Sequence, residues 1–348
     1  MKFTDYIISE NRTITDALRQ LNLLSGRSIT LFVVDSSGAV IGSLTDGDIR
    51  RSIIAGYTLG ERVSNVMHTN FSALRGDKVD VNIIHACRER KITLLPHLND
   101  DGTIRDIYDL STLESILPID AVLMAGGKGE RLRPMTDNTP KPLLMVGEKA
   151  IINHNIDALL NNGISNINIT VNYLGEQIEQ HIKKNYPNQS GIYCIGEDKP
   201  LGTIGAVANI AEFYNDTILV MNSDLLTNIN YEEFYLHHIN SGADMSVAVV
   251  PYQVSVPFAI FTYDNDNKIN GLAEKPTYNY YANAGIYLIK REHLSQVAHG
   301  ERMDATDLIE KLLSEGLLVE QFPINGRWID IGSPDDYRTA CALLTSGV

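Results

Sequence analysis

The sequence predicts an α/β protein in which a mainly parallel sheet is preceded by a smaller, internally repeated module. Over residues 120–348, short apolar runs alternate with helix-patterned segments, as in strands joined by helical crossovers. Residues 1–117 contain a weak duplication with a period of about 64 residues. Residues 1–117 carry 15 acidic and 13 basic side chains, whereas the remainder carries 28 and 16, an asymmetry that also favours two modules.

The first module contains the same order of parts twice. Helix-patterned runs at 14–21 and 79–86 precede apolar strands at 31–34 and 92–95. Hairpin turns follow, and each ends in a glycine, Gly38 or Gly102, where the turn needs a positive φ. We therefore expect two similar small units in tandem.

After the first hairpin, residues 40–51 read VIGSLTDGDIRR, a strand that leads into a helix start. This segment resembles the cystathionine β-synthase (CBS) domain pair, which has a βαββα unit and a Gly-x-x-Ser/Thr-x-x-Asp spacing. Gly42, Thr45 and Asp48 match that spacing. The resemblance implies that Thr45 and Asp48 hold the phosphate and ribose of an adenine nucleotide effector. The alternative is that Asp48 only caps the helix beginning near Ile49.

The second copy departs from this pattern. The corresponding positions hold Asp106, Asp109 and Thr112. If the pair binds a nucleotide, we therefore expect one site rather than two.

Composition excludes several classes of protein. The chain has 44% hydrophobic and 21% charged residues and a net charge of -14, which disfavours nucleic acid and anionic membranes as partners. Its three cysteines form no CxxC pair, so neither a disulfide scaffold nor a zinc site is expected, and a reducing cytoplasm is the expected compartment. No secretory signal is visible. The uncharged stretch 245–263 contains two prolines and is predicted to form two strands and a turn rather than a membrane span.

We place the domain boundary at Pro118, which gives a regulatory module over 1–117 and a catalytic one over 118–348. In the second module, strands are predicted at 121–124, 167–171 and 218–221. Helices are predicted at 150–161, 178–184 and 231–238. Ligands of such sheets bind beyond the carboxyl ends of the strands.

The first of these strands runs into a glycine-rich loop. Residues 123–136 read LMAGGKGERLRPMT, and residues 140–142 read PKP. Glycines let backbone N–H groups approach a polyphosphate, and the cations Lys128, Arg131, Arg133 and Lys141 would attract one to an otherwise acidic chain. The loop is neither a Walker A motif nor a GxGxxG fingerprint.

This signature resembles that of the sugar-1-phosphate nucleotidyltransferases, and the resemblance extends over most of residues 120–340. It implies a Rossmann-like domain in which the loop and Arg131 hold the NTP triphosphate while Lys141 contacts phosphate during the displacement. The loop residues carried over for nucleotide binding are Ala125, Gly126, Gly127, Gly129 and Glu130.

Further segments match the family in order: LGTIGA at 201–206, VMNSD at 220–224, EKP at 274–276, NAGIY at 283–287 and WIDIGSP at 328–334. The resemblance implies that Gly202 and Thr203 contact the nucleobase, and that LGTIGA opens a helix. For the sugar phosphate it implies Glu274, Lys275, Asn283 and Gly285, and for the metal Asp224 and Asp330. Each Asp ends an apolar run, where a hard cation that bridges phosphates needs oxygen ligands, so the expected cofactor is Mg²⁺.

The predicted reaction is in-line attack of a sugar 1-phosphate on the α-phosphate of an NTP, with loss of pyrophosphate. The resemblance favours GTP and an amino-hexose phosphate, as in CBS-fused enzymes that make nucleotide sugars for bacterial surface glycans; heptose or mannose 1-phosphate would fit the same residues. A homo-oligomer is expected. The alternatives are a non-catalytic nucleotide-sensing regulator and an interaction scaffold.

Overall fold

The computed structural model describes residues 3–24 and 29–345. The chain divides into two compact units, Met1–Pro118 with Asn161–Gly163, and Ile119–Leu160 with Ile164–Val348. Within the described residues, every helix is too short or too polar to cross a membrane.

Unit 1 consists of two halves with the same topology. In the first half, β1 (Ile7–Ser9), α1 (Ile14–Leu23), β2 (Thr30–Val34) and β3 (Val40–Thr45) form a sheet of order β1-β2-β3, and α2 (Asp46–Ile54) follows. In the second half, β4 (Leu74–Arg75), α3 (Val81–Glu89), β5 (Leu94–Leu98) and β6 (Ile104–Asp109) form a sheet of order β4-β5-β6. In each, the first pair of strands is parallel and the second antiparallel.

The hairpin turns of the two halves contact each other. Gly38 and Gly102 have φ of 88° and 81°, as their turns were expected to require. The Val40 N–H donates to the Gly102 carbonyl at 3.0 Å. One difference breaks the repeat: a helix follows β3, whereas turns follow β6.

Unit 2 contains a seven-stranded sheet of order β11-β10-β7-β12-β17-β14-β18. Its strands are β7 (Ile119–Met124), β10 (Ile167–Val171), β11 (Ile192–Gly196), β12 (Thr217–Asn222), β14 (Met245–Ser255), β17 (Thr277–Lys290) and β18 (Val319–Pro323). Only β17 runs antiparallel to its neighbours, so the predicted mainly parallel sheet is confirmed. The helices are α4 (Ile151–Asn161), α5 (Gly175–Asn185), α6 (Tyr231–Ser241), α7 (Ala305–Ser314) and α8 (Pro334–Thr345).

Apolar side chains bury both faces of the central strands. Val122, Ile218 and Val220 pack with α7, and a second cluster joins Leu132 and Ile151 to α8. The short pair β13 (Leu225–Thr227) and β19 (Trp328–Asp330) lies beside this second cluster.

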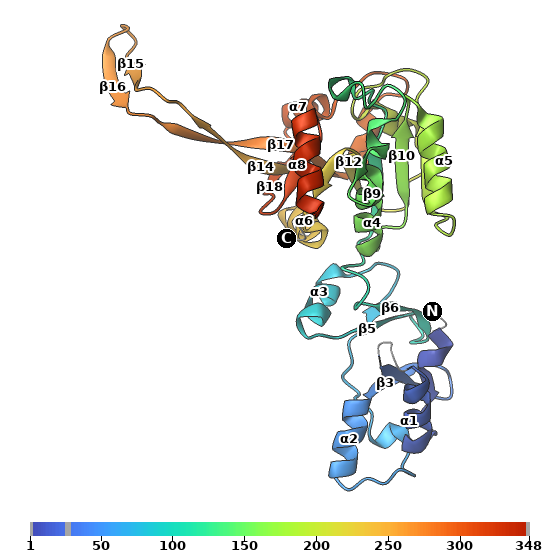
Figure 1. The fold of residues 1–348 in the computed structure, drawn as a ribbon. Coiled ribbons are helices and arrows are strands. Elements are labelled where there is room, and N and C mark those ends of the chain that lie inside the picture. The colour runs from blue at the N-terminus through green and yellow to red at the C-terminus, as the bar shows by residue number, and fades with distance from the viewer. Residues whose placement is uncertain (1–2, 25–28, 346–348) are drawn as a thin grey trace. The chain divides into compact units, whose positions relative to one another are not determined.

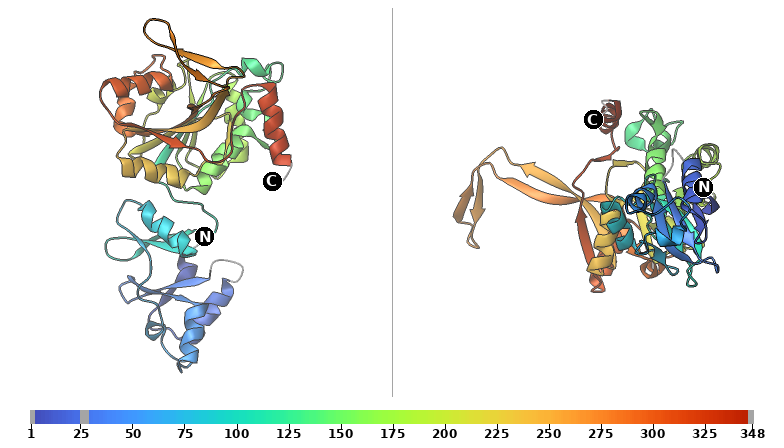
Figure 2. Two further views of the ribbon diagram at one scale, coloured as in Figure 1. Left: turned by 90° about the vertical axis from the view of Figure 1, so that its left-hand side faces the viewer. Right: turned by 90° about the horizontal axis from the view of Figure 1, so that it is seen from below.

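A long antiparallel ribbon leaves the sheet. The outer parts of β14 and β17 pair from Val249 and Asn283 to Ser255 and Thr277, and the hairpin of β15 (Ile260–Tyr263) and β16 (Ile269–Ala273) stands at the tip. Figure 1 and the right-hand view of Figure 2 show this ribbon projecting away from the body of unit 2. The uncharged stretch 245–263 thus forms β14, a turn and β15, as predicted.

The helix expected after the LGTIGA segment is a short 3-10 helix, Gly205–Asn209, rather than an α-helix. The glycine loop leads into a single 3-10 turn, Glu130–Leu132, because Pro134 follows too closely for a helix to continue.

Candidate active site

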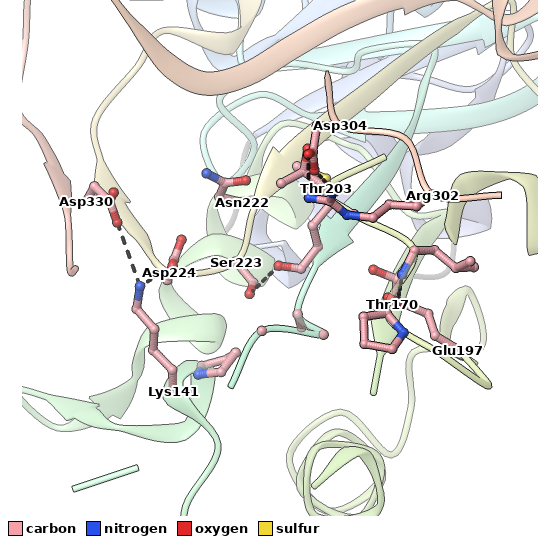
Figure 3. A pocket seen from close by; sticks show the side chains of 18 of the residues that line it. Lys141, Thr170, Glu197, Thr203, Asn222, Ser223, Asp224, Arg302, Asp304 and Asp330 are labelled. Carbon is pink, nitrogen blue, oxygen red and sulfur yellow. Dashed lines mark hydrogen bonds and ion pairs between the residues drawn. The ribbon is translucent and has the colours of Figure 1, made fainter. Parts of the chain in front are cut away.

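The carboxyl ends of β7 and β12 border a cavity of about 430 Å³ (Figure 3). We call it the strand-end pocket. It is lined by the predicted site residues Ala125, Gly126, Gly127, Arg131, Lys141, Gly202, Thr203, Asp224 and Asp330.

Short strand pairing brings the two carboxylates together. Asp224 precedes β13 and Asp330 ends β19, and Leu225 lies opposite Asp330 in the antiparallel pair. The Ile331 N–H also donates to the Asp224 carbonyl at 3.2 Å. Residues more than 100 positions apart are therefore held side by side.

Lys141 lies between the two carboxylates. It is 8% exposed and starts a 3-10 turn between two prolines, which fix the backbone on both sides. Its ammonium pairs with Asp224 and lies 3.8 Å from Asp330 Oδ1. Figure 3 shows the lysine pointing toward both acids.

The electrostatics of these carboxylates suits a cation. Burial raises the pKa of Asp330, and the charge on Asp224 adds to this, while Lys141 and Arg131 oppose it. Asp224 Oδ1 is buried and has no hydrogen-bond partner within the described part of the chain. A divalent cation would satisfy that oxygen and relieve the repulsion, so the donor set fits Mg²⁺.

The glycine loop needs its glycines for two reasons. A Cβ on Gly126 would lie 2.7 Å from Glu197 Oε1, and Gly129 has a φ of 61° and packs against Thr136. Gly126 and Gly127 line the pocket, whereas Gly129 and Glu130 do not. Of the other loop cations, Arg133 pairs with Asp137 at 3.3 Å, and neither it nor Lys128 lines the pocket.

The opposite wall is a turn held against the start of α7. The Thr203 N–H donates to Asp304 Oδ1 at 2.9 Å, and the Ala305 N–H donates to the Thr203 hydroxyl at 2.8 Å. A Cβ on Gly202 would lie 2.5 Å from the Met303 carbonyl oxygen, so only glycine permits this approach. Asp304 also accepts a hydrogen bond from Arg302.

Sequence reasoning missed several lining residues, above all Glu197, Arg302 and Asp304. Glu197 directly follows β11, and its position at the carboxyl end of a parallel strand could have identified it. Burial raises the pKa of Glu197, although the Leu201 N–H donates to its Oε2 at 3.3 Å. Nothing in the sequence linked Asp304 to Thr203, 101 residues away.

The residues expected to contact the sugar phosphate are not assembled in this pocket. Asn283 and Gly285 lie at the base of the ribbon, where a Cβ on Gly285 would be 2.5 Å from the amide of Asn222, a pocket residue. Glu274 and Lys275 lie near the far end of the ribbon and do not line the pocket. The order of the motifs along the chain did not reveal that the long strands β14 and β17 separate Glu274 and Lys275 from the glycine loop.

Unit 1 has a cavity of its own, of about 470 Å³, which we call the repeat pocket. Thr45 and Asp48 line it, as do Arg51, Arg90 and Lys91. Thr45 and Asp48 also form a capping box at the start of α2: the Thr45 N–H donates to Asp48 Oδ2 at 2.8 Å and the Asp48 N–H to the Thr45 hydroxyl at 3.2 Å. Asp48 therefore takes part in capping a helix, as the alternative interpretation predicted, and it also lines a pocket.

Comparisons with known proteins match this architecture. Residues 120–347 match the family model described as nucleotidyl transferase. The catalytic subunit beta of mannose-1-phosphate guanylyltransferase from Drosophila pseudoobscura pseudoobscura is 30% identical over 66% of this chain, but the match spans only 63% of that relative. The bifunctional protein GlmU from Methanocaldococcus jannaschii is 33% identical over 64% of this chain and 53% of that protein. HddC from Yersinia pseudotuberculosis, a solved structure, is 25% identical with a TM-score of 0.52, and covers 65% of this chain and 99% of its own.

Proposed function

Because the chain belongs to the nucleotidyl transferase family, we propose that it joins an NTP to a sugar 1-phosphate and releases pyrophosphate. An oxygen of the sugar phosphate attacks the α-phosphorus, the bond from that phosphorus to the oxygen bridging to the β-phosphate breaks, and pyrophosphate leaves. The attacking oxygen is already anionic, so no general base is needed. The convergence of the glycine loop, Lys141 and two carboxylates at one pocket carries this proposal.

Each element has a role in that reaction. Backbone N–H groups of Ala125, Gly126 and Gly127 would hold the triphosphate, and Arg131 would close over it. Lys141 would contact the α-phosphate, where charge builds up in the transition state. Asp224 and Asp330 would hold Mg²⁺, which when bound supplies charge neutralisation and alignment of the phosphates.

Two considerations favour GTP. The Drosophila relative is named a guanylyltransferase. In addition, Glu197 offers a carboxylate beside Gly126 and the turn at Gly202, and guanine presents two adjacent donors, N1–H and the 2-amino group, that one carboxylate can accept. Uracil, thymine, cytosine and adenine do not present such a pair.

This base assignment is tested with Glu197→Gln. We expect kcat/KM for GTP to fall about tenfold or more relative to that for UTP, because a glutamine cannot accept both guanine donors. Asp198→Asn, an exposed neighbour, is the matched control. An unchanged GTP to UTP ratio in Glu197→Gln would remove this residue from base recognition.

For the sugar we propose an amino-hexose 1-phosphate, with Asn283 and Gly285 at the base of the ribbon and Glu274 and Lys275 as further contacts. Mannose 1-phosphate, suggested by the name of the Drosophila relative, is the rival. The product would be a nucleotide sugar, made in the cytoplasm and used to build surface glycans.

A second proposed function concerns unit 1, which we interpret as a CBS pair that binds an adenine nucleotide and regulates the enzyme. The repeat pocket supports it, because Arg51, Arg90 and Lys91 outnumber the one lining carboxylate, Asp48. An excess of cations favours a phosphate-bearing ligand.

The deciding experiment measures pyrophosphate release with Mg²⁺ while each of five NTPs is paired with hexose, amino-sugar and heptose 1-phosphates. Turnover with GTP would support the reaction. Nucleotide binding by thermal shift without turnover on any pair would favour the non-catalytic regulator, and neither binding nor turnover would refute both.

A further inference from the structure

The ribbon of unit 2 exposes an unusual amount of apolar surface. We call residues 250–282 the arm; it comprises the outer parts of β14 and β17 and the β15–β16 hairpin. Ten of its large apolar side chains are between 39% and 73% exposed. They are Tyr252, Val254, Phe258, Phe261, Tyr263, Ile269, Leu272, Tyr278, Tyr280 and Tyr281. A patch of this kind on a projecting element marks an interaction surface.

The charge pattern indicates what could cover it. Residues 245–263 and 276–289 contain no charged side chain, although the chain as a whole carries a net charge of -14. Two copies of so acidic a chain repel each other over most of their surfaces. The arm does carry charge in residues 264–275, but their three acidic and two basic side chains leave a net charge of only -1. Its aromatic strands are therefore where two copies can meet at least cost. At about 100 Å² for each half-exposed ring, its seven aromatics would bury roughly 700 Å² per copy, close to the share of one partner in a standard interface.

The arm also carries Glu274 and Lys275, which the proposed reaction needs at the strand-end pocket. Lys275 is separated from Asn283, at the base, by eight residues of extended strand, or about 27 Å. Lys275 also has a φ of 44°, a left-handed conformation that a lysine adopts only under local constraint. In the arm as folded here, this ammonium cannot serve the pocket of its own chain.

The strand-end pocket, in turn, has few cations to spare. Of its three lining cations, Lys141 pairs with Asp224 and Arg302 pairs with Asp304, which leaves Arg131 for phosphate charge. The Mg²⁺ proposed for Asp224 and Asp330 would add positive charge, but those two carboxylates offset it. A triphosphate and a sugar phosphate would therefore be bound better if a further cation reached the pocket.

We propose that two copies of the chain associate through their arms, and that each arm delivers Lys275 to the strand-end pocket of the other copy. The first part stands on the exposed surface alone, and the second rests on the proposed function. The two copies are related by a two-fold axis, so both pockets are completed in the same way.

Light scattering tests the association without reference to activity. Wild-type chain should have the mass of a dimer. Tyr252 and Tyr280 are cross-strand partners that are 60% and 56% exposed, so the double variant Tyr252→Ser/Tyr280→Ser should fold normally yet dissociate at least tenfold more readily. Tyr214→Ser, at an exposed tyrosine outside the arm, is the control and should remain dimeric. A wild-type monomer, or a dimer indifferent to the arm variant, would overturn the proposal.

Complementation tests delivery in trans. Lys275→Ala and Asp224→Asn chains, each nearly inactive alone, are co-expressed with different tags and purified as a mixture. If Lys275 acts on the other copy, half of the dimers are mixed and each contains one complete site, so roughly a quarter of wild-type turnover returns. Lys268→Ala, at another lysine of the arm, is the control and should be active by itself.

The outcomes separate the two proposals. Turnover by wild-type chain with no recovery in the mixture would mean that Lys275 acts within its own chain, which overturns delivery in trans and leaves the proposed function standing. No turnover by wild-type chain would refute the proposed function, and delivery with it, while the mass of the arm variant would still decide the association.

Discussion

The strand-end pocket and the repeat pocket are nearly equal in volume, about 430 and 470 Å³, but they differ in charge. Four carboxylates and three cations line the first, whereas one carboxylate and three arginine or lysine side chains line the second. Carboxylates repel phosphate unless a cation lies between them. The first pocket should therefore depend on a metal to admit a nucleotide, and the second should bind an anion directly.

The two pockets also differ in how the chain builds them. Asp224 and Asp330 meet only because β13 pairs with β19, whereas Thr45 and Asp48 are three residues apart in one capping box. A substitution in the first pocket should therefore affect chemistry above all, and one in the second should affect local stability as well as binding.

The largest effect is expected from Asp224→Asn. Loss of this carboxylate removes one of two proposed metal ligands, so kcat should fall on the order of 10³-fold while circular dichroism stays unchanged. Asp335→Asn, an exposed carboxylate on α8, is the control. Turnover near the wild-type level would exclude Asp224 from the metal site.

Removal of divalent metal should separate the two pockets. With a chelator present, GTP affinity should fall about 100-fold, because the carboxylates then face the triphosphate without a cation. The affinity of the repeat pocket for AMP should fall no more than about twofold. Isothermal titration calorimetry of both ligands, with and without chelator, measures these affinities. An equal loss of affinity for GTP and AMP would mean that the two pockets do not differ in their dependence on metal.

A smaller effect is expected from Arg90→Ala in the repeat pocket. Its guanidinium lines the pocket, with Nη1 3.4 Å from the Ser72 hydroxyl. Loss of one charge-assisted contact should weaken AMP binding about tenfold. Turnover without AMP should not change. If AMP affinity were retained, the effector would have to bind elsewhere.

The sequence predicted the parallel sheet and the loop after its first strand, because these depend on local patterns of apolar runs and glycines. It also singled out Asp224 and Asp330, which the structure brings to one pocket, while their role in metal binding stays a prediction. It could not predict Glu197 or the pairing of Thr203 with Asp304, which depend on contacts between distant segments. The position of Glu274 and Lys275 was missed for a related reason. An apolar strand pattern does not indicate how far a strand extends beyond the body of the protein. A motif on a projecting arm therefore has the same sequence pattern as a motif at a pocket.

The smallest effect is expected from Asp48→Ala, which tests stability rather than binding. Burial raises the pKa of Asp48, but hydrogen bonds from Thr45 and Arg51 outweigh this and hold it below the ordinary value of 3.8. A lowered pKa in the folded state means that the carboxylate stabilises the fold fully above pH 3.8 and loses this effect as the pH falls through the folded pKa. Thr45 is the N-cap and Asp48 its partner in the capping box, and loss of the Asp48 carboxylate should cost about 1 kcal/mol at pH 7.

Urea unfolding of wild-type and Asp48→Ala chains, followed in unit 1 between pH 7 and pH 3, measures this difference. The gap should be widest near neutral pH and should close as Asp48 becomes protonated. Asp46→Ala, in the same helical turn but outside the capping box, is the control. A gap as wide at pH 3 as at pH 7 would mean that the side chain acts through packing rather than through its charge. AMP binding that survives Asp48→Ala would limit Asp48 to its role in the capping box.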